Sequence, residues 1–149
     1  MDETIENILH REQLTLASIS KRSLAFFIDE MLLSLLLIIA LWDSFNGAKD
    51  VNELINVTNS FLFEYLFLKI IYQAFFTMQY GASIGKLLLK IRVIELRTLS
   101  NPNVIVSLNR AIFRVISEMF FYLGFLWGML QPSRQTLHDK TARTLVINA

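Results

Sequence analysis

The chain has 149 residues, of which 54% are hydrophobic and 18% charged, and its mean hydropathy is +0.46. Soluble domains carry about 25% charged residues, so this composition argues against a soluble globular domain and against a disordered chain. The net charge of +1 is unlike that of a nucleic-acid binder, and the absence of cysteine excludes disulfides and cysteine-based metal or catalytic sites. Because two histidines are too few for a histidine-rich metal site, we expect no metal and no cofactor.

Residues 1–20 form an acidic and polar N-terminal segment, which we expect to lie in the cytoplasm, and residues 21–149 form the membrane domain. Within the segment, Ile5, Ile8 and Leu9 predict a short amphipathic helix that lies on the membrane or on a partner. The segment lacks the basic start and the small-residue cleavage site of a secretory signal. We therefore expect the apolar stretch that follows it to stay in the protein as an anchor.

Two apolar stretches, residues 24–42 and 57–80, are each long enough to cross the roughly 30 Å hydrocarbon core of a bilayer. Trp42 ends the first stretch, as an aromatic residue at the membrane interface would. The ionisable residues Glu64 and Lys69 interrupt the second stretch. We predict that both stretches are full transmembrane helices.

A third region, Leu108–Leu130, is less uniformly apolar. Arg110, Arg114 and Glu118 recur every four residues, so its first half has one charged helical face. The uninterrupted apolar run, residues 119–130, is too short to span the bilayer as a helix and is typical of a re-entrant or interfacial segment. We favour a re-entrant segment, and a third full span is the alternative.

Between the second and third regions the sequence favours strands. Residues 90–93 alternate polar and apolar side chains, residues 101–103 supply a turn, and residues 104–106 are β-branched. These features predict a β-hairpin, which residues 144–147 extend as a third strand. The predicted fold is thus mainly α and polytopic, with two full spans, the third region and a small cytoplasmic β-hairpin.

The distribution of charge predicts the orientation in the membrane. The connection of residues 43–56 is acidic, whereas the connection of residues 81–110 and the C-terminal tail are basic. Lys and Arg gather on the cytoplasmic side of a membrane protein. We therefore expect an integral protein of the cell inner membrane with both termini in the cytoplasm, which agrees with two spans and a re-entrant third region.

Ionisable residues within the apolar stretches are candidates for function, because such residues are costly in a bilayer and are usually paired. Asp29 lies two helical turns after Arg22, on nearly the same helix face. Antiparallel spans bring Lys69 close to the depth of Asp29, so we predict an interhelical Asp29–Lys69 pair. Glu64 has no evident partner and is a candidate proton carrier. Structural salt bridges and an ion or proton path both remain open.

Two motif-like strings carry weaker signals. Residues 81–87 are one residue short of a phosphate-binding loop, and Leu87 replaces the magnesium-binding hydroxyl. We therefore predict a glycine turn that ends the second span, with Lys86 at the lipid headgroups. His138 and Asp139 lack a nucleophile with motif support, so we expect no enzyme. Asp139 is better explained as the partner of an arginine in the membrane core or as a backbone cap.

Three stretches, residues 22–29, 81–93 and 137–146, resemble in order the three motifs of the RDD family of bacterial membrane proteins. The matching positions of the first stretch are Arg22, Ala25, Ile28 and Asp29. Those of the central loop are Gly81, Gly85, Lys86, Ile91, Arg92 and Val93. Those of the closing motif are His138, Asp139, Ala142, Thr144 and Val146. The sequence departs from the family pattern at Ser83, Lys90 and Arg143, where Thr, Gly and Gly are common.

The resemblance implies a transport-related membrane protein, with cation/proton exchange as the activity proposed for some members. It also implies that Arg22, Asp29 and Asp139 form one cluster at the cytoplasmic end, beside Lys86. We expect Asp29 to carry the ion or proton, with Arg22 and Lys69 as charge partners and Asp139 as a gate or an anchor. One copy supplies too few spans to enclose a path, so we expect a homo-oligomer or a membrane partner. The alternative is a non-catalytic membrane assembly or accessory subunit whose buried charges are structural.

Overall fold

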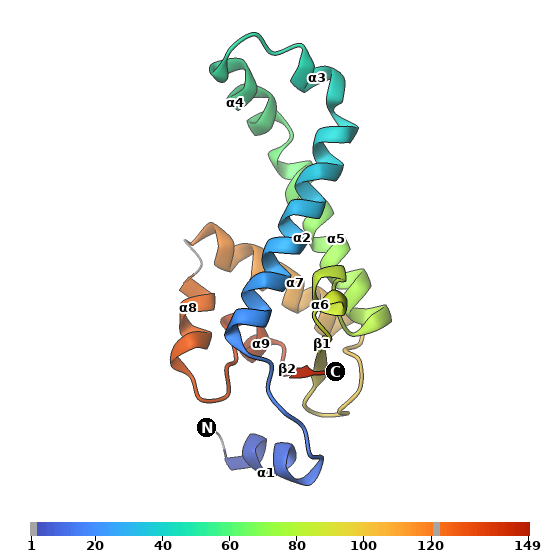
Figure 1. Cartoon of the computed structure of the whole chain (residues 1–149), viewed down its shortest axis with the longest axis vertical. Coiled ribbons are helices and arrows are strands. Elements are labelled where there is room, and N and C mark those ends of the chain that lie inside the picture. Colours follow the sequence, from blue (N-terminus) through green and yellow to red (C-terminus); the bar gives the residue numbers. More distant parts are fainter. Residues whose placement is uncertain (1–2, 121–122) are drawn as a thin grey trace.

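The computed structural model describes residues 3–120 and 123–149 and is mainly helical (Figure 1). Its helices are α1 (Glu3–Arg11), α2 (Ile19–Ala40), α3 (Trp42–Asn46), α4 (Val51–Ser60), α5 (Leu62–Tyr80), α6 (Ile84–Leu88), α7 (Val104–Met119), α8 (Leu123–Leu130) and α9 (Leu137–Thr141). Its strands, β1 (Ile91–Glu95) and β2 (Thr144–Asn148), pair antiparallel. The predicted mainly helical class with a small antiparallel element is confirmed.

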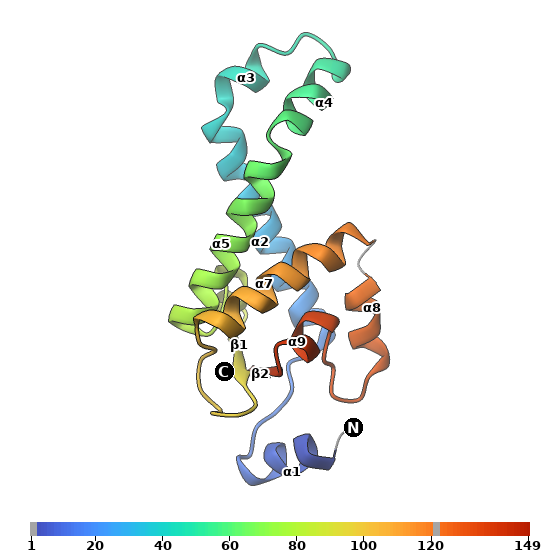
Figure 2. The same cartoon turned by 180° about the vertical axis from the view of Figure 1, so that it is seen from behind.

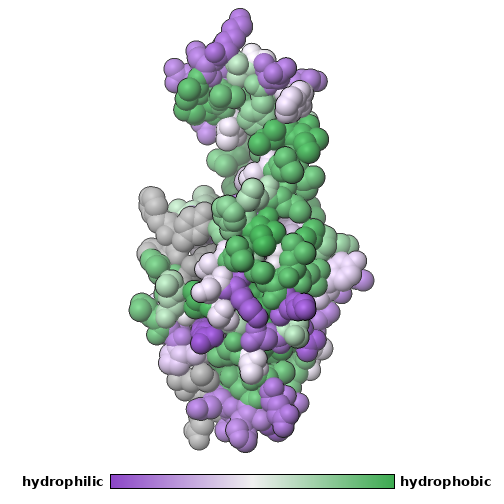
Figure 3. Space-filling model, in the orientation of Figure 1, coloured by the Kyte–Doolittle hydropathy of each residue, from purple (hydrophilic) through white to green (hydrophobic). Residues whose placement is uncertain are grey.

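The molecule has a long helical arm and a broader base. Helices α2 and α5 form the arm, α3 and α4 lie at its tip, and α6 to α9, the sheet and both chain ends lie at the base (Figures 1 and 2). Figure 3 shows apolar side chains along the arm, between a polar tip and a polar lower end of the base. This banded surface matches the apolar interior and polar faces of a bilayer.

Helix α2 covers the first predicted span up to Ala40, and Trp42, the last residue of that span, begins α3. Ser18 caps the first turn of α2 by accepting a hydrogen bond from the Lys21 backbone N–H at 3.2 Å. Its buried residues follow one narrow stripe: Arg22, Ala25, Asp29 and Leu33. Among the described residues, α2 is the one helix that by itself is long and apolar enough to cross a membrane, and only 17% of its apolar window is buried inside the molecule. The core helix of a soluble protein would be mostly buried, so the exposed surface of α2 fits contact with lipid.

The second predicted span is not one continuous helix. Helices α4 and α5 meet at Phe61, and their axes are bent by 53°. Just before the break, the hydroxyls of Thr58 and Ser60 donate to backbone carbonyls four residues earlier, at 2.9 and 2.7 Å. Such bonds favour a bend in a helix. The bent pair is long and apolar enough to count as one span, so the described residues contain one such crossing, or up to two.

The third predicted region contains two short helices rather than a full span. Helix α7 has 16 residues and α8 has 8, lengths of about 24 and 12 Å at 1.5 Å per residue. Neither helix alone reaches across a hydrocarbon core. Phe121 and Tyr122, which belong to this predicted region, lie outside the described residues.

The predicted β-hairpin is wrong in its second strand. Residues 104–106 begin α7, because the side chain of Asn103 accepts a hydrogen bond from the Val106 backbone N–H at 2.9 Å and caps the helix. The partner of β1 is instead β2 from the end of the chain, with Val93 opposite Val146. The prediction of a C-terminal strand beside residues 91–93 is confirmed.

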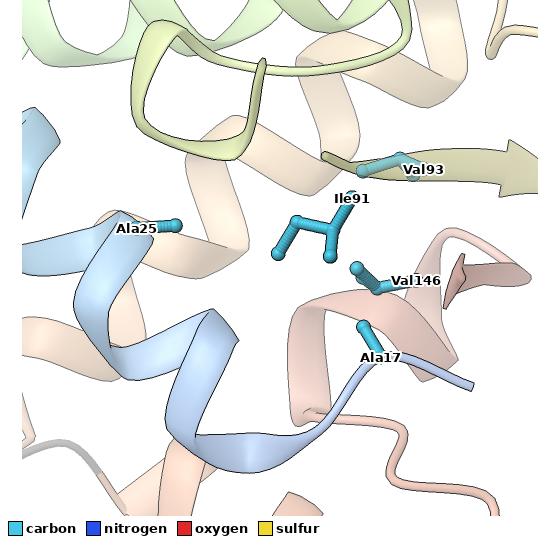
Figure 4. Close-up of a cluster of buried hydrophobic side chains, with 5 residues drawn as sticks. All are labelled: Ala17, Ala25, Ile91, Val93 and Val146. Carbon is cyan, nitrogen blue, oxygen red and sulfur yellow. The ribbon is translucent and has the colours of Figure 1, made fainter. Parts of the chain in front are cut away.

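A small apolar core surrounds this sheet. Ala25 of α2 and Ala17 pack against three side chains of the sheet, namely Ile91 and Val93 of β1 and Val146 of β2 (Figure 4). A second buried cluster contains Ile5 of α1 and three residues of the strands, namely Ile94, Leu145 and Ile147. The apolar side of α1 therefore packs on the chain's own sheet, and the predicted contact of this helix with a membrane or a partner stays a prediction.

Candidate functional site

A buried carboxylate, Asp139 of α9, joins three helices at the base. Its Oδ2 lies 2.5 Å from Nη2 of Arg22 on α2, and its Oδ1 forms an ion pair with Nη1 of Arg110 on α7. The Thr136 backbone N–H donates to Oδ2 at 3.1 Å as part of a capping box at the start of α9, in which the Thr136 side chain accepts from the Asp139 backbone N–H. The Thr136 hydroxyl also donates to Oδ2, at 2.8 Å. Although burial raises the pKa of this carboxyl, Arg110 and Arg22 hold the pKa of Asp139 well below its usual range.

The two arginines of this cluster contact more than the carboxylate. Arg22 donates to the backbone carbonyl of Arg134, and Arg110 donates to the Thr144 hydroxyl at 2.9 Å. The first turn of α2 is therefore attached to the segment before α9, and the middle of α7 is attached to the segment after α9. Thr144, a position of the closing motif, belongs to this network as the residue that begins β2.

Asp29 lies in a different environment from Asp139. Its carboxylate is fully buried and accepts hydrogen bonds from the Tyr72 hydroxyl at 2.8 Å, the Ser83 hydroxyl at 2.6 Å and the Gly85 backbone N–H at 2.8 Å. No ion pair joins Asp29 to a residue in the described part of the chain. Arg22 and Asp139 thus form an ion pair, whereas Asp29 has a separate set of hydrogen-bond partners.

The glycine turn allows this arrangement. Gly81 ends α5 with φ +69°, a conformation that favours glycine, as predicted for the turn after the second stretch. A Cβ atom on Gly85 would lie 2.2 Å from the backbone oxygen of Ala25. Only glycine therefore permits α6 to approach α2 closely enough for the Gly85 N–H to reach Asp29.

The predicted Asp29–Lys69 pair is wrong. Lys69 instead forms ion pairs with Glu30 at 2.9 Å and with Glu118 of α7, and Glu118 also lies 3.3 Å from Nε of Arg114. Adjacent residues on a helix point about 100° apart, so only one of the two neighbouring acids of α2 can face Lys69. The acid that faces it is Glu30, and this network links α2, α5 and α7.

The predicted position of Lys86 at the lipid headgroups is also wrong. Its side chain is buried and lines a small cavity at the base, together with Arg22, Phe26, Arg110, Arg114 and His138. Burial and the neighbouring guanidinium groups of Arg110 and Arg114 lower the pKa of the Lys86 ammonium well below its usual range. The cavity therefore concentrates positive charge next to the Arg22–Asp139 pair.

The remaining predicted residues divide into two groups. His138 is buried beside the cluster, with Nε2 3.0 Å from the Thr136 hydroxyl, and burial lowers its pKa well below the usual value. Glu64 and Arg92 are exposed and lie outside the site. The structure thus gathers the first and closing motifs and Lys86 at the base, with the Lys69 network farther along α5.

Several contributors were missed by the sequence prediction. Tyr72 and Ser83 carry no motif that assigns them to Asp29. Arg110, Arg114 and Glu118 did carry a signal, because charges every four residues in an apolar sequence must share a buried polar face. The described residues contain no group of three His, Cys, Asp or Glu side chains that could hold a metal ion.

The comparisons with known proteins agree with the motifs. A family model described as the RDD family matches residues 16–143, which is most of the chain. The matched range contains Arg22, Asp29 and Asp139, and the resemblance that these motifs carry is confirmed. Neither a curated protein nor a solved structure matches the chain.

Proposed function

Because the chain belongs to the RDD family, whose model matches residues 16–143, we propose that it is a membrane transport protein that exchanges a cation for protons as an oligomer. The family and the exposed apolar helix α2 indicate a membrane location. The observation that carries the transport proposal is the environment of Asp29. It is a fully buried carboxylate on the candidate span, and its hydrogen-bond partners are Tyr72, Ser83 and Gly85, none of which is a cation.

Neutral partners suit a carrier better than a fixed counter-charge does. Hydroxyl groups donate to an ionised carboxylate and accept from a protonated one, so Tyr72 and Ser83 can satisfy Asp29 in both states. Carboxylate and hydroxyl oxygens are also the ligands that hard cations prefer. Asp139, by contrast, lies between two guanidinium groups that favour its ionised form, so in this proposal it is an anchor and not a carrier.

The oligomer follows from the number of helices. One chain offers α2 and the bent α4–α5 pair, which are too few to enclose a path by themselves. In the proposed arrangement the apolar faces of α2 and α5 contact a second copy, a membrane partner or lipid in the cell inner membrane. Both chain ends lie at the base, and the basic connection of residues 81–110 supports a cytoplasmic position for that end (Figure 1).

A second candidate function is a membrane assembly or accessory subunit. The observation that favours it is the pairing of two further carboxylates inside the molecule: Asp139 with two arginines, and Glu118 with Lys69 and Arg114. Such pairs hold α2, α5, α7 and α9 together without any transport step. In this reading Asp29 fixes the glycine turn against α2.

Flux measurements in proteoliposomes separate the two functions. The wild type, Asp29→Asn, Asp139→Asn and the exposed control Asp43→Asn are compared for sodium- or potassium-driven proton movement and for thermal unfolding. Transport predicts that Asp29→Asn loses flux while its melting temperature stays near that of the wild type, and that Asp43→Asn keeps both. A wild type without flux, together with an Asp29→Asn variant that fails to fold, would support the assembly function instead.

A further inference from the structure

The small cavity at the base has a lining that is rich in positive charge. Its volume is about 10 Å³, which is close to the smallest volume that holds one water molecule. Four elements contribute to its wall: α2, α6, α7 and α9. The lining residues are Arg22, Phe26, Lys86, Arg110, Arg114 and His138.

The carboxylates nearby do not balance these cations. Asp139 is shared by Arg22 and Arg110, and Glu118 is shared by Arg114 and Lys69. The Nη2 atom of Arg114 is buried and has no hydrogen-bond partner among the residues that the structure describes, and Arg114 as a whole is only 5% exposed. The cavity is thus lined by a guanidinium group with unused hydrogen-bonding capacity.

Lys86 is the second unbalanced group. Its side chain is 6% exposed and forms no hydrogen bond or ion pair with any other residue that the structure describes. Asp29 and Asp139 attract the ammonium from α2 and α9, but burial and the repulsion from Arg110 and Arg114 outweigh them and lower its pKa. A buried cation without a partner is costly, and a counter-ion placed next to it removes that cost.

We propose that this cavity binds one monovalent anion of halide size, such as chloride, between Lys86 and Arg114. The volume is closest to that of a monatomic ion, which needs only a small outward shift of the Lys86 and Arg114 side chains, whereas phosphate or sulfate has five heavy atoms and would have to displace the wall. The wall also includes the ring of Phe26, whose centroid lies 5.0 Å from the Arg114 guanidinium carbon, so this cation–π contact holds the Arg114 side chain in place beside the cavity. The bound anion stabilises the ammonium form of Lys86, so anion binding is coupled to proton uptake. This site is independent of the proposed cation exchange and can be tested without a flux assay.

The test is the thermal unfolding of the full chain in detergent at pH 7 and constant ionic strength. Sodium chloride and sodium bromide should raise the melting temperature above its value in sodium gluconate, in a saturable way. The increase should be about 2–4 °C once the halide exceeds its dissociation constant about fivefold. Equal melting temperatures in halide and gluconate would overturn the proposal. So would an increase with phosphate and none with chloride.

A pair of lysine variants tests the location of the site. Lys86→Met removes a buried amine without a partner, so its melting temperature in gluconate should equal or exceed that of the wild type, and the halide-dependent increase should disappear. Lys49→Met, which changes an exposed lysine at the tip, should keep the increase. An increase that survives in Lys86→Met contradicts the site. Should that variant fail to fold, chloride-35 NMR of the wild type decides: line broadening that bromide relieves supports the site, and its absence overturns it.

Discussion

Arg22 and Asp139 lie 117 positions apart in the chain and form a buried ion pair. The pair attaches the first turns of α2, the candidate membrane helix, to α9 near the C-terminus. Because Arg110 of α7 pairs with the other oxygen of the same carboxylate, one acidic side chain holds two arginines and balances one of their two positive charges. The first and closing motifs of the family thus act together in the fold.

Asp139→Asn should therefore be strongly destabilising. It leaves two buried guanidinium groups without their counter-charge, and breaking a buried pair costs about 3–5 kcal/mol. Arg22→Met should cost less, because Asp139 keeps Arg110. Thermal unfolding in detergent measures both. The control is Glu12→Gln, whose ion pair with Arg11 is exposed and should contribute almost nothing. A melting temperature for Asp139→Asn that equals the wild-type value would contradict this role.

Gly85→Ala should separate α6 from α2. The added Cβ would lie 2.2 Å from the Ala25 backbone oxygen, a distance that neither backbone can accept without moving. The hydrogen bond from the Gly85 N–H to Asp29 would then be lost, and we expect a fall in stability of about 2–4 kcal/mol. The matched control is Gly47→Ala at the tip, where the nearest atom lies 3.2 Å from the added Cβ. Circular-dichroism melts that show the same loss for both variants would argue against the close contact.

The sequence was sufficient to predict the features that depend on local pattern. The long apolar run of α2, the turn at Gly81 and the C-terminal strand are each set by residues that are neighbours in the chain. The break at Phe61 and the helix that begins after Asn103 were missed although residues close in the chain contribute to both, because a side-chain bond to the backbone competes there with the intrinsic preference of the segment. Residues 104–106 are β-branched and favour a strand, but the side-chain cap of Asn103 and the packing of α7 against α5 outweigh that preference.

The site was predicted less well than the elements, because a partner depends on the rotation of one helix against another. The depth of the residues along the two helices predicted that Lys69 lies near Asp29. A rotation of α2 by about 100° about its axis, however, decides whether Asp29 or Glu30 faces Lys69. The position of Lys86 could not be predicted either. Its burial depends on α7, whose arginines surround it from a distant part of the sequence.

Glu118 should matter more for stability than Glu30, although both pair with Lys69. Glu118 serves Lys69 and Arg114, whereas the Glu30 side chain is 23% exposed and its loss leaves Lys69 with Glu118. We expect Glu118→Gln to cost about 3 kcal/mol and Glu30→Gln about 1 kcal/mol or less. Urea or thermal titrations of the two variants give the comparison. The reverse order would mean that Lys69 depends mainly on Glu30.

His138 should make the protein less stable as the pH falls below about 6.5, the usual pKa of histidine. Burial lowers the pKa of His138 in the folded chain, so between these two pKa values the unfolded state binds a proton that the folded state does not. The contribution of His138 to the free energy of unfolding is then fully present above pH 6.5. It declines as the pH falls, by at most about 1.4 kcal/mol per pH unit. His138→Gln should remove this slope between pH 6.5 and 5, whereas His10→Gln, which changes an exposed histidine of α1, should retain it. Melting temperatures of the three proteins across this range are the measurement, and a His138→Gln variant with the wild-type slope would show that another group titrates.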